Sequence, residues 1–309
     1  MKNLSFYDQE AYCQNLFDRK GPFWHIATPG DSTSILFTNP DDYRFGMSLL
    51  AVCAWECNLK VYAFQIMSNH LHNIAGASEE QCCYDFLESY SHRLMRYASN
   101  KGCELDLSTF VASPIEIDSL QSLRNNIVYT HRNAYVIDAS QTPFSCPWGS
   151  GPLYFGSDIN EFASRKFNDL PYREKRMILN GRVKDLPDTF VVRNSCIAPE
   201  SICDWRTGRS FFRDAHQYFN LLGRNFEAYA EFASLLKDKS FMTDAEMYSA
   251  ACVVAKQQYN ISVPSLLPSE AKLEMARKLH FDYRAGNNQI RRILKIDIDT
   301  VNAMFPSAR

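Results

Sequence analysis

Two histidines separated by one residue, His70 and His72, are the first residues whose types and spacing suit chemistry. They flank Leu71 at the start of an apolar run that is typical of a β-strand. Side chains two residues apart on a strand point to the same face, about 6.6 Å apart along the backbone at roughly 3.3 Å per residue. Two imidazoles in this arrangement can bind one metal ion. The spacing is also compatible with two ordinary hydrogen-bonded histidines, and both interpretations stay open at this point.

A tyrosine and an asparagine further along the chain form a second such group. Tyr129 and Asn133 lie in a segment with helical periodicity and are four residues apart, so the phenol and the amide share one helix face. The amide oxygen of Asn133 could complete a metal site, and Tyr129 would then be a nucleophile beside it. A phenol, whose ordinary pKa is about 10, needs a metal that polarises the phosphorus centre, or a stabilised phenolate, before it attacks. The alternative is a packed helical aromatic residue and a helix cap.

The segments around these residues predict the elements that must bring them together. Strand-like runs cover residues 22–28, 34–37, 61–67 and 70–75, and helical periodicity covers about 39–57, 79–100 and 119–135. Residues 113–117 fit either a further strand or the approach to the last helix. The order strand, helix, strand, strand, helix is the beginning of a ferredoxin-like split unit. The sequence therefore predicts an α+β domain with an antiparallel sheet in residues 1–156, ending in a turn-rich segment.

The remainder of the chain predicts an all-α C-terminal half. Residues 157–265 form a helical region in which no motif can be interpreted, and residues 266–309 carry a pattern that resembles a helix-turn-helix. Apolar residues at helical spacing and a capping residue, Asp297, support this pattern. The candidate DNA contacts in it are Arg291, Arg292, Ile298, Thr300 and Asn302. A plain three-helix cap fits the same pattern.

Composition limits the classes of function. The chain has 309 residues, 46% of them hydrophobic, with 33 basic and 35 acidic side chains, which predicts a folded protein that cannot hold nucleic acid by bulk charge. Ten cysteines diluted in this length, without paired Cys-x-x-Cys motifs, favour free thiols over disulfides or a zinc site. Neither an N-terminal signal peptide nor a stretch of about 20 apolar residues is present, so we expect a cytoplasmic protein without a membrane partner.

Five segments, taken in order along the chain, resemble single-tyrosine HUH transposases, and the resemblance covers about the first half of the chain. These segments are Trp24-His25-Ile26, Ile35-Leu36-Phe37 before Asp41-Asp42, Met67-Ser68-Asn69-His70-Leu71-His72, Tyr129-Thr130-His131-Arg132-Asn133-Ala134 and Pro147-Trp148-Gly149-Ser150. The match is best to the branch of REP-associated tyrosine transposases. Two residues depart from the family pattern, because Ser68 and Ala134 stand where members usually have proline.

The resemblance implies a fold, a metal and a nucleophile. It implies a ferredoxin-like HUH domain in which His70, His72 and Asn133 bind a divalent metal, Mg²⁺ or Mn²⁺, and Tyr129 attacks a DNA phosphodiester to form a 5′-phosphotyrosine. The stored ester bond lets a second strand be joined without ATP, and the chain indeed has no Walker-type motif for a nucleotide cofactor. The substrate class is single-stranded or hairpin DNA, with duplex DNA as a second partner of the C-terminal region. The oligomeric state is left open.

Basic and aromatic neighbours are candidate DNA contacts. Arg93, Arg96, Arg124 and Arg132 could position phosphates that flank the cleaved one, and Trp148 could stack on an unpaired base. Solvated helix faces for the arginines and a buried core position for the tryptophan are the alternatives.

Three functions are compatible with these observations. The leading hypothesis is a DNA transposase or nickase that cleaves and rejoins single-stranded, hairpin-associated DNA. The second is a catalytically inactive regulator that binds hairpin DNA with the same domain. The third is a metal-binding ferredoxin-like protein with an unrelated substrate.

Overall fold

The computed structural model describes residues 6–28, 37–68, 70–102, 113–133, 146–155, 164–224, 244–281, 283 and 285–306. The chain divides into two compact units, Met1–Gly223 and Arg224–Arg309, where the sequence suggested three parts with boundaries after 156 and 265. Most of the strand expected at 34–37, as well as Asn69 and Ala134, lies outside the described residues. The cysteines of the described part are free thiols. None of the helices described there has the length and apolar composition to cross a membrane.

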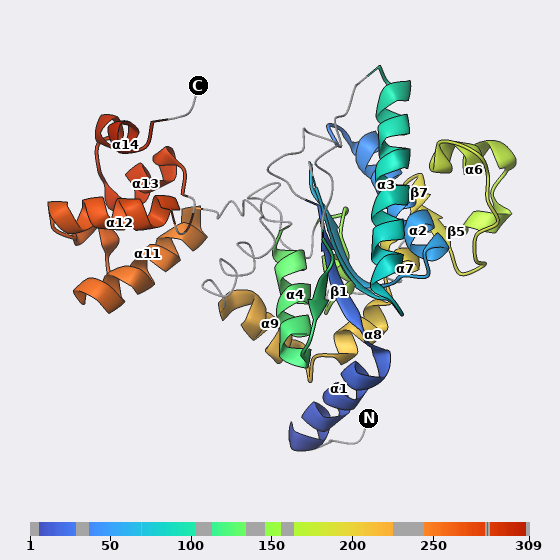
Figure 1. Cartoon of the computed structure of the whole chain (residues 1–309), viewed down its shortest axis with the longest axis horizontal. Helices are drawn as coiled ribbons and strands as arrows, with labels where there is room; N and C mark the ends of the chain where they lie inside the picture. Colours follow the sequence, from blue (N-terminus) through green and yellow to red (C-terminus); the bar gives the residue numbers. More distant parts are fainter. Residues whose placement is uncertain are drawn as a thin grey trace. The chain divides into compact units, whose positions relative to one another are not determined.

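A four-stranded antiparallel sheet forms the centre of the first unit (Figure 1). Its strands are β1 (Phe23–Ala27), β2 (Lys60–Ile66), β3 (Leu71–Gly76) and β4 (Ile115–Ile117), in the order β2-β3-β1-β4. The strands expected at 22–28, 61–67 and 70–75 are confirmed, and each of their ends differs by one residue from the expected one. The segment 113–117, for which two interpretations were open, contains a strand because it pairs with β1.

Helices cover both faces of this sheet. α2 (Pro40–Glu56) connects β1 to β2, α3 (Glu80–Asn100) connects β3 to β4, and the two helices pack against each other. α4 (Leu120–Arg132) packs on β2 and β3 from the opposite side (Figure 1). α1 (Phe6–Lys20) precedes β1 and contacts α4.

Local sequence signals explain where these helices begin and end. The side-chain oxygen of Asn39 accepts hydrogen bonds from the backbone N–H groups of Asp41 and Asp42, and Pro40 occupies the first turn of α2. The Ser119 side chain caps α4 in the same way. After α3 the chain turns at Gly102, whose φ of 74° is a conformation that glycine adopts without strain.

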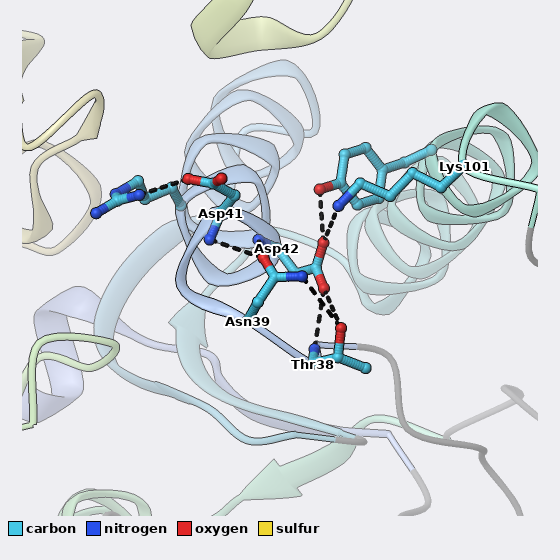
Figure 2. Close-up of polar contacts among 7 residues, drawn as sticks. Thr38, Asn39, Asp41, Asp42 and Lys101 are labelled. Atoms are coloured by element: carbon cyan, nitrogen blue, oxygen red, sulfur yellow. Dashed lines mark hydrogen bonds and ion pairs between the residues drawn. The ribbon is translucent and has the colours of Figure 1, made fainter.

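Asp42 fastens the start of α2 to the end of α3 (Figure 2). One carboxylate oxygen accepts hydrogen bonds from the backbone N–H and the hydroxyl of Thr38, at 3.0 and 2.7 Å. The other accepts from the Tyr97 hydroxyl at 2.7 Å and pairs with the Lys101 ammonium. Burial on its own would raise the pKa of this carboxyl, but the hydrogen bonds from Lys101, Thr38 and Tyr97 outweigh burial and hold the pKa well below its ordinary value.

Residues 164–223 also belong to the first unit. They contain a three-stranded sheet and several short helices, so the C-terminal half is mainly helical but not all-α. Strands of two or three residues have no period that a sequence pattern could reveal. η1 (Gly151–Leu153) precedes this segment. The elements of the segment are β5 (Arg165–Lys166), η3 (Phe167–Asp169), α6 (Tyr172–Leu179), β6 (Val191–Arg193), β7 (Cys196–Ile197), α7 (Pro199–Ile202), α8 (Trp205–Ser210) and α9 (Ala215–Arg224), which ends one residue beyond it. β7 packs against α2 and α8 against β2, which makes this segment part of the same core.

The second unit is a small helical bundle. Its elements are α11 (Asp244–Tyr259), η4 (Pro264–Leu266), α12 (Ser269–Phe281), α13 (Asn287–Leu294) and α14 (Ile298–Met304). It has a hydrophobic core of its own, centred on residues such as Met275, Leu279 and Ile290. α13 and α14 pack together and are joined by three residues, of which Lys295 has a left-handed φ of 54° and Asp297 caps α14.

Candidate functional site

The two histidines of the His-x-His pair meet in the fold, and a third histidine joins them. His72 lies on β3 opposite Ala27 of β1, so alternation along β1 places His25 on the same face of the sheet. The Nε2 atoms of His70 and His72 are 3.1 Å apart, and Nδ1 of His72 is 3.1 Å from Nε2 of His25. All three side chains are buried, with His70 the most exposed at 7%.

Tyr129 of α4 lies against this cluster. Its ring centroid is 5.3 Å from that of His72 and 6.0 Å from that of His25, in edge-on arrangements. The ring is 2% exposed, so it is enclosed, and two of its neighbours are imidazoles rather than hydrocarbon. The helix and the strand that sequence reasoning singled out therefore do bring the phenol and the imidazoles to one place.

Asn133 lies one helical turn beyond Tyr129, at the C-cap of α4. It is 1% exposed, and its side-chain N–H donates to the backbone carbonyl of Tyr129 at 3.3 Å. This hydrogen bond uses the nitrogen of the amide, and the other atom of the amide, its carbonyl oxygen, is the atom type that binds cations.

The separation of the two imidazole nitrogens is that of a hydrogen bond between the rings, and it also suits a shared metal ion. Two nitrogen ligands at about 2.1 Å from one ion, at tetrahedral or octahedral angles, are about 3.0 to 3.4 Å apart. The Nε2 atoms of His70 and His72 are 3.1 Å apart. Within the described residues no group of three or more histidine, cysteine or acidic side chains is arranged to hold a metal. His70 and His72 are thus the two nitrogen ligands that the described residues could offer a metal here, and the amide of Asn133 is the third ligand that the resemblance implies.

His25 and Asn126 are site residues that the sequence reasoning did not assign. Nδ1 of His25 is 2.6 Å from Oδ1 of Asn126, which lies one turn before Tyr129 on α4. His25 could have been found only by pairing the expected strands, since the register of β1 with β3 is what places it beside His72. Asn126 is three residues before Tyr129, on neighbouring parts of the helix face.

The Pro147–Ser150 segment ties α4 to the edge strand β2. Gly149 forms a bridge with Gln65, and a Cβ atom on Gly149 would lie 2.1 Å from the Gln65 Oε1 atom, so a larger residue there requires the Gln65 side chain to move. The Ser150 hydroxyl accepts a hydrogen bond from the Phe64 backbone N–H at 2.8 Å and lies 2.8 Å from Nε2 of His131 on α4. Complete burial lowers the pKa of His131 to about 3, so this histidine is neutral at physiological pH and acts as a structural hydrogen-bonding group.

The turn before the histidines closes through backbone hydrogen bonds, with Ser68 where the resemblance leads one to expect proline. The Met67 backbone N–H donates to the His70 carbonyl at 2.8 Å, and the Ser68 carbonyl accepts from the Phe37 N–H at 2.9 Å. These two hydrogen bonds fix the entry into β3 through the backbone.

The four arginines expected near DNA phosphates have different surroundings. Arg124 is 1% exposed, and its guanidinium binds both carboxylate oxygens of Glu10 and the Phe211 carbonyl. It therefore stabilises the packing of α1 and the 205–212 region on α4, and these contacts give no support to a role in phosphate binding. Arg132 is also buried.

Arg93 and Arg96 lie on α3, on the other face of the sheet from α4 (Figure 1). Arg93 is paired with Glu56. Both arginines line a cavity of about 220 Å³. Neither, then, lies on the side of the sheet that carries Tyr129.

Trp148 stacks on another ring. Its centroid is 5.1 Å from that of Tyr43 on α2, with the planes 19° apart, and its carbonyl accepts a hydrogen bond from the Ile66 N–H. One face of the indole is thus occupied, and the residue is partly buried.

The C-terminal candidates lie in the second unit, at α13 and α14. Arg291, Arg292, Thr300 and Asn302 are exposed, and Ile298 is partly buried. The Asn302 side chain accepts a hydrogen bond from Asn287 at 2.9 Å. The apolar residues at 290, 293, 294 and 301 face the core, as their spacing predicted.

No family model, no curated protein and no solved structure matches the chain. The chemistry of the site therefore has to be inferred from its own residues.

Proposed function

We propose that the protein is a tyrosine transposase of the single-tyrosine HUH type, a metal-dependent endonuclease and strand transferase for single-stranded, hairpin-associated DNA. One observation carries the proposal: the Tyr129 ring lies 5.3 Å from that of His72, whose Nε2 is 3.1 Å from that of His70. A phenol beside two converging imidazoles is the arrangement that a metal-assisted attack on a phosphodiester needs.

The topology supports the same proposal. A sheet with the order β2-β3-β1-β4, all antiparallel, with both crossover helices packed together, is the arrangement of a ferredoxin-like fold. The nucleophile helix α4 then covers the face of the sheet that carries the histidines. We propose the ferredoxin-like HUH assignment for residues 1–156 on this basis, with 164–223 as an addition packed on the same core.

The proposed reaction is one in-line substitution at phosphorus. The Tyr129 hydroxyl oxygen forms a bond to the phosphorus atom and gives up its proton, while the bond from phosphorus to the 3′ oxygen breaks and that oxygen takes a proton. The products are a 5′-phosphotyrosine and a free 3′-hydroxyl, and attack by a second 3′-hydroxyl reverses the chemistry and rejoins DNA. Mg²⁺ or Mn²⁺ bound by His70, His72 and Asn133 would supply Lewis-acid polarisation of a non-bridging oxygen.

Access to the nucleophile is part of the proposal. Since Tyr129 is only 2% exposed, its hydroxyl has to become more accessible before a phosphate can reach it.

The second unit would add binding of duplex DNA. Its helices α13 and α14, with the three residues that connect them, have the form of a helix-turn-helix. The proposal includes the cytoplasmic location expected from the sequence.

The burial of Tyr129 also supports a second candidate function, DNA binding without cleavage. If the phenol never becomes accessible, the same domain would act as a regulator that binds hairpin DNA without cutting it.

A covalent-adduct assay separates the two candidates. Single-stranded oligonucleotides taken from hairpin repeats near the gene are incubated with the protein and Mn²⁺, and adducts are resolved on a denaturing gel. The transposase predicts a shifted band that Tyr129→Phe abolishes and that Tyr43→Phe, a matched change on α2, leaves in place. Binding without any adduct in the wild type would instead support the regulator, and metal retention without DNA binding would support a ferredoxin-like metal protein with another substrate.

A further inference from the structure

A chain of three buried side chains leads from the backbone of α4 to the histidine pair. We propose that Asn126 and His25 form a hydrogen-bond relay that fixes the tautomer of His72, so that its Nε2 lone pair is directed toward His70. His25 and Asn126 would be positioning residues for the metal site, since they act through His72. The identity of the ligand at His72 as a metal ion rests on the proposed function, whereas the placement of the protons does not.

The relay begins at a group that cannot change its role. A backbone carbonyl only accepts hydrogen bonds, and the Ser122 carbonyl lies 2.8 Å from Nδ2 of Asn126. The Asn126 amide must therefore donate from this nitrogen, because a flipped amide would bring two oxygens to 2.8 Å. Its Oδ1 atom consequently faces His25 as an acceptor.

The second step sets the proton on His25. Nδ1 of His25 lies 2.6 Å from the Asn126 oxygen, so Nδ1 must carry the proton and donate it. In a neutral imidazole the other nitrogen then has no proton, and Nε2 of His25 is an acceptor.

The third step passes this choice to His72. Nδ1 of His72 is 3.1 Å from the accepting Nε2 of His25, so His72 donates from Nδ1 and its own Nε2 has a lone pair. That Nε2 is the atom 3.1 Å from Nε2 of His70. The metal-binding lone pair of His72 is thus aimed at its partner ligand through an alternation of donors and acceptors that begins at the helix backbone.

Because the three side chains of the relay are buried, the other tautomers of the histidines are energetically costly. His25 and His72 are 0% exposed and Asn126 is 4% exposed, so water cannot easily replace a missing partner. The other neutral tautomer of either histidine would set two N–H groups, or two lone pairs, against each other inside the protein, and such unpaired buried groups are costly. Outer groups that orient metal-binding histidines commonly change metal affinity by about 10- to 100-fold when removed.

Nitrogen NMR on the full-length, metal-free protein labelled with ¹⁵N-histidine tests the proton placement directly. The expected spectrum shows His25 and His72 both protonated at Nδ1 only, with the His72 signal assigned from its loss in His72→Ala. In Asn126→Leu the His72 signal should become a mixture of tautomers, while in the neighbouring control Asn125→Leu it should not change. A wild-type His72 protonated at Nε2, or at both nitrogens, would overturn the relay.

Mn²⁺ titration of the same proteins, without DNA, tests its consequence. We expect Asn126→Leu to weaken Mn²⁺ binding by about 10- to 100-fold and the neighbouring control Asn125→Leu to be unchanged. If Asn126→Leu is unfolded by circular dichroism, the wild-type spectrum alone decides.

The two proposals can fail separately. The expected tautomers in a protein that forms no DNA adduct would refute the transposase and leave the relay intact. Adduct formation with the wrong tautomers would refute only the relay.

Discussion

His72 and Tyr129 face each other edge-on, with ring centroids 5.3 Å apart and planes at 80°. One ring comes from a central strand and the other from the helix that covers it, so each is held by a different element. The phenol is therefore positioned by α4 and the imidazole by β3, and a substitution of one residue need not displace the other.

Loss of either histidine should remove the proposed metal site and spare the fold and the proposed binding of DNA. We expect His70→Ala and His72→Ala each to lower adduct formation by about 100-fold or more, since removing a single group that stabilises the charge of the transition state costs this much. Oligonucleotide affinity, measured by fluorescence anisotropy, should stay within about threefold. His92→Ala, an exposed histidine on α3, is the matched control. Adduct yields equal to the wild type in both variants would contradict the metal site.

Gly149 should be a position where alanine destabilises the domain. An added Cβ would lie 2.1 Å from Oε1 of Gln65 and 3.1 Å from the Phe64 carbonyl, so the buried, hydrogen-bonded side chain of Gln65 on the edge strand β2 would have to shift. We expect Gly149→Ala to lower the free energy of unfolding by about 1 to 3 kcal/mol, the usual cost of overpacking, in urea titrations followed by circular dichroism. Gly181→Ala has its nearest contact at 3.7 Å and serves as control. Equal stability of the two variants would show that the edge of β2 yields without cost.

Local patterns predicted most of the elements that position this site. The strands carrying His25 and His72, with His70 directly before the second, and the helix carrying Tyr129 each have the length and period of their type. The caps at Asn39 and Ser119 mark helix starts. The sequence therefore predicted a strand with the histidine pair and a helix with the phenol in one domain.

Long-range partners could not be predicted in the same way. The assignment of His25 depends on the register between β1 and β3, and the role of Arg124 depends on Glu10, a residue distant in sequence. The strands β5 to β7 are held by pairing with one another and by packing on α2, and they are too short to have a period of their own.

The Asp42 contacts predict a specific loss of stability in acid. Hydrogen bonds hold the folded-state pKa of Asp42 below its unfolded value near 3.8, so its contribution is complete above that value and is lost as the pH falls through the folded-state pKa. We expect the wild type to lose more free energy of unfolding than Asp42→Asn as the pH is lowered from about 5 to 2. Urea titrations at each pH measure this difference. Parallel curves for the two proteins would show that Asp42 is not coupled to folding.

The α13–α14 pair predicts a salt-dependent interaction with duplex DNA. Arg291 and Arg292 are exposed at the end of α13, close to the connection that leads into α14 with its exposed Thr300 and Asn302. Cationic side chains at this place would contact phosphates, whereas the polar side chains of α14 would contact base edges. The double variant Arg291→Ala/Arg292→Ala should weaken duplex binding about equally for all sequences and lower the slope of log affinity against log salt by about 2. Arg277→Ala, an exposed arginine on α12, should leave the slope unchanged. A double variant with the wild-type slope would mean that α13 does not face DNA, and the three helices would then be a structural cap.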